Sequence, residues 1–391
     1  MIDVNKAFEI TQSHTFQPET EIVNFVKSRG SVLAEDVYSD ISMPPFNKSA
    51  MDGYACRYED LQNVLEVLEI IPAGVTPKYK IGKNQCSKIM TGAMVPEGAD
   101  TVIIVEHVEK LDSNHIQFRQ TKTSRNICYL GEDVKKGDLV MSKGELLTSR
   151  HIPVLASVGK TEVRIYKKPK VGILVTGDEL KEPDEPLELA EIRNSNAYTL
   201  ISLLEEMQIE PVYYGILRDR LDVAQTRFQE ALNENDVLIL TGAVSMGDFD
   251  FVPQMLKNNE FEIHFHGIKV KPGKRLIFGT KKNKAVFGLP GNPVSTFAQF
   301  LFLVKPYLLK NMGAKADLKY FHLQLENDFQ RQNSEKTEFV PVTLNKNSKV
   351  LIKEYHGSAH FNVLSSSDGF MMIPEGITAI NMGETVQVFL F

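Results

Sequence analysis

The sequence predicts a multi-domain protein of the α/β plus β class. Three observations carry this prediction: short β-like runs fill residues 1–165, strands alternate with helices over residues 166–315, and strand patterns return over residues 316–391. With 391 residues, the chain is long enough for roughly two to four domains of ordinary size.

The N-terminal part combines helical and strand patterns. Apolar residues recur at helical spacing from Val4 to Ile10 and from Ile22 to Val26, which predicts two short helices. The following apolar runs, such as residues 64–71 and 101–108, are separated by turns that contain Gly or Pro. We therefore expect this half of the chain to be rich in strands.

The central part predicts a sheet rich in parallel strands. Strands are expected at residues 171–175, 212–217, 237–240 and 286–289. Helices are expected through residues 197–207, 224–232 and 294–309, the first of them capped within the segment 194–196. Strand, loop and helix in succession indicate a parallel sheet with right-handed crossovers.

The C-terminal part predicts a small β domain. Its strands are expected at residues 321–325, 339–344, 350–354 and 386–391.

Composition excludes several classes of protein. The longest apolar run has five residues, 300–304, whereas a membrane span needs roughly 18 or more. The N-terminus carries the charged residues Asp3, Lys6 and Glu9 where a signal peptide would be apolar. The net charge of −6 does not favour nucleic acid as a partner.

Cysteine usage indicates a reducing, cytoplasmic compartment. Cys56, Cys86 and Cys128 are odd in number and far apart, which argues against a disulfide framework and a zinc site. We expect these three side chains to be inert packing residues.

The candidate site is the edge of the sheet where the parallel strands end, because ligands bind there in open α/β sheets. This rule selects the loops at residues 176–179, 218–219, 241–250 and 290–293. Glycines allow close approach of backbone N–H groups and hydroxyls add donors, which together suggest a phosphate cradle; these residues are Gly177, Gly242, Gly247, Gly291, Thr176, Thr241 and Ser245.

The same loops carry many carboxylates, namely Asp178, Glu179, Asp219, Asp248 and Asp250. They would repel an anionic ligand unless a cation is bound, and oxygen ligands beside phosphate favour Mg²⁺. Nearby, Lys269, Lys271 and Lys274 surround a Pro-Gly turn that could hold a second, oxyanionic ligand. This combination suggests transfer or hydrolysis at a phosphoryl group.

Each feature also has a simpler interpretation. A Thr-Gly or Gly-Asp pair after a strand is more often a plain turn or helix cap, and Asp52-Gly53 alone is more often a hairpin turn. Lysines such as Lys271, and equally His264 and His266, would by themselves be solvated surface side chains. Several such loops at one sheet edge favour a site.

Longer motifs resemble a known family. Residues 44–55 (PPFNKSAMDGYA), 91–100 and 131–133 resemble the N-terminal motifs of the MoeA family of molybdopterin molybdenumtransferases, which includes the E domain of gephyrin. Residues 176–180, 241–247, 271–274 (KPGK) and 288–293 (GLPGNP) continue the resemblance, which covers essentially the whole chain.

The resemblance implies cleavage of adenylylated molybdopterin with release of AMP, and insertion of molybdenum from molybdate. Mg²⁺ is the implied cofactor, with Glu179, Asp219 and Asp250 as its ligands. The catalytic residues would be these three with Asp52 and Asp133. The substrate-binding residues would be Thr91, Thr176, Gly177, Thr241, Gly242, Ser245, Gly247, Pro290, Gly291 and Asn292, and those for molybdate Lys271, Lys274, Arg275 and Ser358.

The resemblance further implies four domains. These would be residues 1–40 with 136–165, an inserted β domain at 41–135, a molybdopterin-binding-like α/β domain at 166–315, and a C-terminal β domain at 316–391. It also implies a homodimer whose sites are shared between subunits, and it allows a molybdopterin adenylyltransferase as a further partner.

The sequence departs from the family pattern at three positions. Family members usually have an Arg where this chain has Cys128 and another where it has Pro341, and some have a Lys in place of Gly267. Loss of the C-terminal Arg removes a bidentate oxyanion ligand. We hypothesise that Arg275, which stands where Pro is usual, replaces its charge.

Two other function classes compete with the transferase. A nucleotide hydrolase with the same α/β module would cleave a free dinucleotide without molybdate, but such enzymes lack the N-terminal match. A non-catalytic scaffold would bind the pterin or a protein partner, but retention of Asp52, Glu179, Asp219 and Asp250 argues against it.

Overall fold

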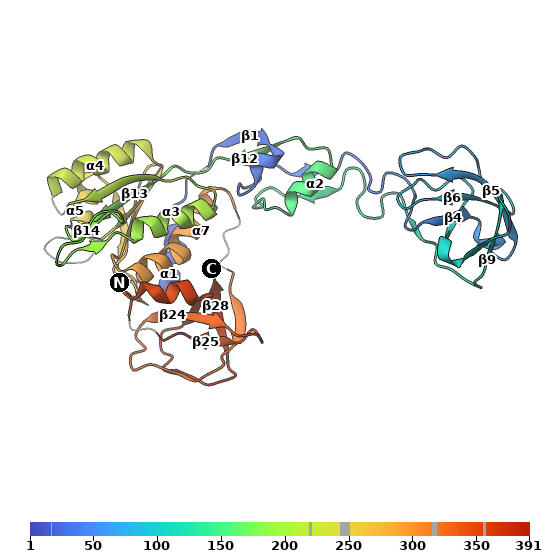
Figure 1. Ribbon diagram of the computed structural model, residues 1–391. Coiled ribbons are helices and arrows are strands. Elements are labelled where there is room, and N and C mark those ends of the chain that lie inside the picture. The colour runs from blue at the N-terminus through green and yellow to red at the C-terminus, as the bar shows by residue number, and fades with distance from the viewer. Residues whose placement is uncertain (17, 219–220, 243–250, 315–318, 355–356) are drawn as a thin grey trace. The chain divides into compact units, whose positions relative to one another are not determined.

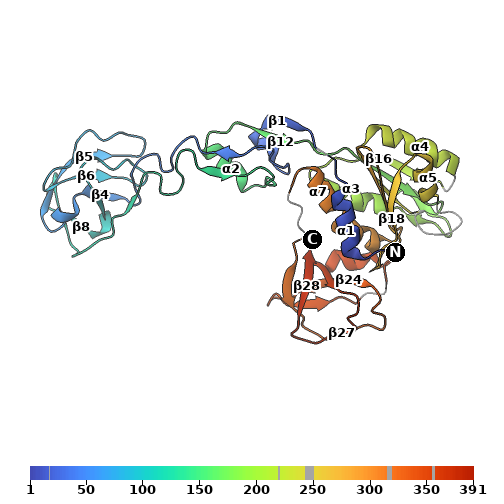
Figure 2. The same ribbon diagram turned by 180° about the vertical axis from the view of Figure 1, so that it is seen from behind.

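The computed structural model describes residues 1–16, 18–218, 221–242, 251–314, 319–354 and 357–391, and Figures 1 and 2 show it from opposite sides. The chain forms two compact units. Unit 1 comprises residues 1–34, 144–148 and 163–391, and unit 2 comprises residues 35–143 and 149–162. Within the described ranges, no helix is both long and apolar enough to cross a membrane.

Unit 1 contains a six-stranded central sheet. Its strands are, in spatial order, β16 (Val212–Leu217), β13 (Val171–Thr176), β17 (Val237–Thr241), β21 (Lys284–Leu289), β20 (Ile277–Lys281) and β18 (Glu262–His266). The first four run parallel, as predicted, and β20 and β18 add an antiparallel edge.

Helices cover both faces of this sheet (Figure 1). One face packs against α1 (Val4–Ser13), α3 (Asn196–Glu206), α6 (Pro293–Gln299) and α7 (Lys305–Asn311). The other face packs against α4 (Leu221–Glu234) and α5 (Val252–Asn258). Side chains of β13 alternate accordingly, with Ile173 and Val175 in the first core and Leu174 in the second.

The predicted apolar helix over residues 294–309 is interrupted by a π-helical turn. This turn, Phe300–Val304, joins α6 to α7, and all five of its residues are buried. Burial on every side explains the continuous apolar run, which marks a core helix and not a membrane span.

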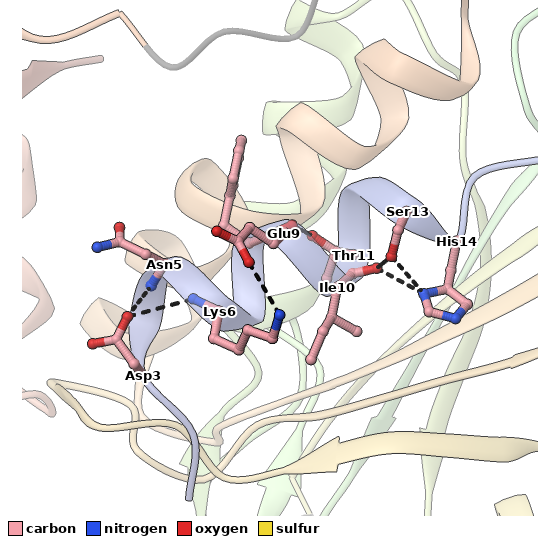
Figure 3. Close-up of polar contacts among 9 residues, drawn as sticks. Asp3, Asn5, Lys6, Glu9, Ile10, Thr11, Ser13 and His14 are labelled. Carbon is pink, nitrogen blue, oxygen red and sulfur yellow. Dashed lines mark hydrogen bonds and ion pairs between the residues drawn. The ribbon is translucent and has the colours of Figure 1, made fainter.

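Helix α1 begins where its sequence predicts (Figure 3). The Asp3 carboxylate accepts hydrogen bonds from the backbone N–H groups of Asn5, at 2.7 Å, and Lys6, at 3.4 Å. Such a cap satisfies donors that the first helical turn leaves free. Val4 and Ala7 then bury the apolar face in the first core.

The prediction of a second N-terminal helix was wrong. Residues Thr20–Asn24 form strand β1, which pairs with β12 (Glu162–Tyr166), and Phe25–Ser28 form a short 3₁₀ helix. Ile22 is 56% exposed and Val26 is 59% exposed, so their helical spacing does not mark a buried face. β-Branched side chains and a distant pairing partner favour the strand instead.

The C-terminal part of unit 1 is a second sheet (Figure 2). Its order is β19 (Val270–Lys271), β24 (Thr337–Leu344), β26 (Gly369–Ile373), β28 (Thr385–Leu390) and β22 (Phe321–Gln324), with β25 (Val350–Ile352) paired to β24. The four predicted strands are present, and β26 is an addition. Because β19 pairs with β24, Lys271 lies opposite Glu338.

Unit 2 is rich in strands, as predicted. Its main sheet has the order β7 (Thr101–Ile104), β4 (Gly53–Cys56), β6 (Gln85–Ile89), β5 (Val64–Ile71), β9 (His115–Phe118) and β8 (Val108–Lys110). The remaining elements are α2 (His151–Ser157) and the pairs of β2 (Val37–Tyr38) with β11 (Leu139–Met141) and β3 (Lys48–Ser49) with β10 (Ile127–Cys128).

Two of the three cysteines lie in the core of unit 2. Cys56 and Cys86 are free, fully buried and opposite each other on neighbouring strands. Burial raises the pKa of Cys56 to about 12, so its thiol stays protonated and unreactive. The expectation of inert packing is thus confirmed for these two residues, whereas Cys128 is half-buried.

The expectation that His264 is a solvated surface side chain was wrong. Its side chain is 6% exposed, and its ring stacks on His14 at the end of α1, with 3.7 Å between ring centroids. The Nε2 atom lies 2.7 Å from the hydroxyl of Thr280. Burial, and secondarily the neighbouring His14, lower the pKa of His264.

Acidification is therefore expected to destabilise unit 1. The pKa of His264 is lower in the folded chain, so below the unfolded value of about 6.5 the unfolded chain binds more protons. The stability contributed by neutral His264 is present above this value and is lost progressively as the pH falls from it through the lower folded pKa. Thermal midpoints measured between pH 7.5 and 5 should fall less steeply in His264→Gln, whereas His322→Gln, an exposed control, should keep the wild-type slope. Equal slopes in all three proteins would contradict this assignment.

Candidate functional site

The described residues at the ends of β13, β17 and β21, and directly after them, come together at one edge of the central sheet. Parallel strands end on the same side, so the loops after them are neighbours. They enclose a cleft of about 580 Å³, together with the start of α3. The predicted residues that line it are Thr176, Gly177, Glu179, Thr241, Gly242, Gly291 and Asn292.

The glycine of the second loop allows the loops to approach closely. Gly242 has φ of +85°, and a Cβ atom there would lie 2.5 Å from the carbonyl oxygen of Thr176. The Thr176 hydroxyl donates to the carbonyl of Thr241 at 3.2 Å. The N–H groups of Gly177 and Gly242 bond at 3.3 Å to carbonyls of neighbouring strands. The expectation that these N–H groups form a phosphate cradle was therefore wrong at these two residues, which provide close packing instead.

Asn196, the first residue of α3, is a cleft residue that the sequence did not reveal. Its Nδ2 donates to the carbonyl of Gly291 at 2.7 Å, while its buried Oδ1 has no hydrogen-bond partner within the described part of the chain. Because a carbonyl only accepts, this bond fixes the orientation of the amide. The predicted helix cap comes from Asn194, which accepts from the N–H of Ala197.

Glu179 is the exposed carboxylate of the cleft. The described residues contain no cluster of three His, Cys, Asp or Glu side chains that could hold a metal. The predicted metal ligands Asp219 and Asp250, like Ser245 and Gly247, lie outside the described residues. The donors present among the described residues are the Glu179 carboxylate and two threonine hydroxyls. These hard oxygens fit Mg²⁺ in kind.

A second depression, which we term the basic hollow, adjoins the cleft. It has a volume of about 390 Å³, and Asn292 lines both spaces. The predicted residues in its wall are Lys271, Lys274, Arg275, Ser358 and Pro290. Lys336, which the sequence did not reveal, lines it as well. Lys274, Arg275 and Lys336 form no ion pair with a described residue, so the hollow favours an anion.

Ser358 is fixed in the basic hollow by the start of α6. Its hydroxyl accepts from Nδ2 of Asn292 at 2.8 Å, and its carbonyl accepts from the N–H of Val294 at 3.1 Å. A segment that is distant in sequence thereby completes the wall.

A buried ion-pair network lies behind Lys271. The Lys271 ammonium is 2.7 Å from one carboxylate oxygen of Glu338, and the guanidinium of Arg331 is 3.2 Å from the other. Arg331 also donates to the carbonyls of Lys336, Pro374 and Ile377. Glu338 and Arg331 are nearly fully buried.

Comparison with known proteins identifies the family. The MoeA N-terminal region (domain I and II) matches residues 2–159, a domain described as "Probable molybdopterin binding domain" matches residues 172–310, and the MoeA C-terminal region (domain IV) matches residues 324–391. The chain belongs to the MoeA family of molybdopterin molybdenumtransferases.

Individual members of the MoeA family match along their length. The molybdopterin molybdenumtransferase of Staphylococcus epidermidis is 34% identical, with 100% of this chain and 95% of the relative covered. That of Haemophilus influenzae is 35% identical, with coverages of 95% and 94%. The crystal structure of the MoeA protein from Pyrococcus horikoshii OT3 matches with a TM-score of 0.84 at 32% identity, covering 100% of both chains.

Three residues predicted from the MoeA resemblance lie in unit 2. Asp52 precedes β4, and its Oδ1 accepts from the N–H of Thr91 at 2.6 Å and from the Thr91 hydroxyl at 2.8 Å. The backbone bond first, and the hydroxyl second, lower the pKa of Asp52. Gly53 is the first residue of β4 and not part of a hairpin turn. Asp133 is an exposed side chain.

The departures from the MoeA pattern have local structural correlates. Pro341 is buried in β24, and the cation that the C-terminal part adds to the basic hollow is Lys336. Gly267 has φ of +93°, a conformation that disfavours the Lys of other members. Cys128 is half-buried beside Glu132, and its pKa is raised, mainly by desolvation.

Removing the carboxylate of the buried network is expected to destabilise unit 1. Glu338→Ala leaves the guanidinium of Arg331 buried without a counter-charge, which costs about 3 kcal/mol of unfolding free energy. Denaturant titration measures this loss. Glu335→Ala removes a nearby exposed carboxylate, and its free energy of unfolding should stay within about 0.5 kcal/mol of wild type. A similarly small change in Glu338→Ala would contradict the role of the network.

Proposed function

We propose that the chain inserts molybdenum from molybdate into adenylylated molybdopterin and releases AMP, as a step of molybdenum cofactor biosynthesis. The observation that carries this proposal is that the cleft and the basic hollow differ in character and share Asn292 in their walls. The cleft suits the phosphates of a nucleotide-linked pterin, and the basic hollow suits an oxyanion. Both substrates can therefore meet in one unit of the chain.

In the cleft, the loops after the parallel strands receive the substrate. We assign pterin and phosphate binding to Thr176, Gly177, Thr241, Gly242, Ser245, Gly247, Pro290, Gly291 and Asn292. Pro290 lies in the wall of the basic hollow, between the two ligands.

The acidic residues act on the phosphoanhydride. Glu179, with Asp219 and Asp250, would hold Mg²⁺, which neutralises charge on the phosphate oxygens when bound. These carboxylates also orient the water that attacks the phosphoanhydride, and AMP departs as the leaving group. Asp52 and Asp133, with Thr91, complete the catalytic set from unit 2.

In the basic hollow, four assigned residues would receive molybdate: Lys271, Lys274, Arg275 and Ser358. The cations neutralise the dianion, while the Ser358 hydroxyl donates a hydrogen bond to an oxyanion oxygen. Lys336 is a further cation in this wall. Arg275 replaces the charge of the missing family Arg in this proposal.

The proposed assembly is a homodimer in the cytoplasm. Its subunits have four domains, comprising residues 1–40 with 136–165, 41–135, 166–315 and 316–391. Unit 2 of one subunit contributes Asp52, Thr91 and Asp133 to the cleft of the other. A molybdopterin adenylyltransferase is the proposed source of the adenylylated substrate.

The decisive experiment follows AMP release and metal-loaded cofactor together. Purified protein is incubated with adenylylated molybdopterin and Mg²⁺, with and without molybdate. We expect AMP release that depends on molybdate and on Mg²⁺, and a loss of roughly a hundredfold in Glu179→Ala because charge on the phosphates is no longer stabilised. Glu210→Gln, an exposed carboxylate without an ion pair to a described residue, is the matched control and should keep wild-type activity.

The same assay separates the competing functions. AMP release without molybdate would contradict the transferase and favour a hydrolase. Tight pterin binding without any AMP release would leave only a scaffold.

Arg275→Ala tests the replacement of charge in the basic hollow. We expect a molybdate KM roughly tenfold higher than that of wild type, because one cation of the wall is lost. An unchanged dependence on molybdate would show that Arg275 does not replace the missing family Arg.

A further inference from the structure

The turn that carries Lys271 and Lys274 is supported at three points. We term residues 269–274 the lysine turn. At its base, the N–H of Ile268 donates to the carbonyl of Lys274 at 3.0 Å. On one side, Glu338 holds the ammonium of Lys271. At its centre, the buried side chain of Gln299 donates from Nε2 to the carbonyl of Pro272 at 3.1 Å.

The contact with Gln299 fixes the centre of the lysine turn against α6. Gly273 has φ of +92°, and a Cβ atom there would lie 3.0 Å from Nε2 of Gln299 and 3.2 Å from Cβ of Ser295. The backbone of the turn therefore packs directly on α6. Pro272 and Gly273 are the two residues between Lys271 and Lys274. This contact therefore fixes the backbone from which both lysine side chains extend.

The amide of Gln299 has a described partner for only one of its two polar atoms. Its side chain is fully buried, and its Oε1 has no hydrogen-bond partner among the residues that the structure describes. The carbonyl of Pro272 only accepts, so the amide cannot be turned around without losing its bond. Pure packing would be served better by Met or Leu, which bury no unpaired oxygen. The Nε2 donor is the half of the amide that has a partner, and this partner is the backbone of the lysine turn.

We propose that Gln299 is a positioning residue of the oxyanion site. It acts through the carbonyl of Pro272, which it holds so that Lys271 and Lys274 face the basic hollow at a fixed spacing. The inference rests on the proposed function, since it assumes that the hollow binds molybdate. Gln299 lies behind the turn and does not line the hollow itself.

Gln299→Met is the direct test, because Met has nearly the same volume and lacks the donor. Removing the amide leaves one carbonyl unpaired but also removes the unpaired Oε1, so thermal stability should change little. Molybdate affinity, measured by calorimetry on the full-length protein, should fall about tenfold, which corresponds to about 1.4 kcal/mol. The molybdate KM should rise likewise, whereas kcat at saturating molybdate and the KM for adenylylated molybdopterin should stay within about twofold.

Gln12→Met is the matched control. Gln12 is a nearly fully buried residue of α1 with an unpaired Nε2 and no hydrogen bond to the lysine turn, so this variant should bind molybdate like wild type. Gln299→Asn is the second variant, used if Gln299→Met folds poorly. Its shorter side chain cannot reach Pro272, and it should show the same loss of affinity.

The outcomes are distinguishable. Weaker molybdate binding in the Gln299 variants, with the thermal midpoint kept, supports the positioning role. Wild-type affinity in both Gln299 variants overturns it and leaves the proposed function intact. Absence of molybdate binding in the wild-type protein would overturn the oxyanion assignment, and this inference with it.

Discussion

The candidate site depends on one constraint, namely that parallel strands end at the same edge of a sheet. β13, β17 and β21 run side by side, so three loops far apart in sequence meet where these strands end. Packing of helices on both faces holds the strands in register. The loops can then vary in sequence, because the strands and not the loops carry the core. Close approach of the loops requires Gly242, where any side chain would meet the backbone of Thr176.

A second sheet supplies the other half of the site. The short strand β19 leaves the central layer and pairs with β24, which brings the lysine turn to the C-terminal sheet. Ser358 returns from that sheet to the start of α6. The basic hollow is therefore built by two layers at once, and its cations come from both. The buried pair of Glu338 and Arg331 stabilises this junction, since each charge is compensated where water is excluded.

Sequence patterns predicted those features that depend on local periodicity. The parallel strands, the helices α3, α4 and α6, four strands of the C-terminal sheet and the positions of the glycine loops follow from spacing and turn chemistry, and motif resemblance indicated the family. The short helix α5 was not predicted. Sequence patterns failed where a distant partner decides the structure. Thr20–Asn24 forms a strand because β12 pairs with it, and His264 is buried because the end of α1 covers it. Asn196, Lys336 and Gln299 were missed for the same reason, since their partners or hollows exist only after folding.

The central claim is that phosphate and oxyanion bind in adjoining spaces that share Asn292. Crystals of the protein soaked with molybdate and AMP, and measured at the molybdenum absorption edge, test it most directly. The account predicts an anomalous molybdenum peak in the basic hollow beside Lys274 and Ser358, with the AMP phosphate in the cleft beside Gly242 and Gly291. A molybdenum peak away from the lysine turn, or AMP bound outside the cleft, would contradict it.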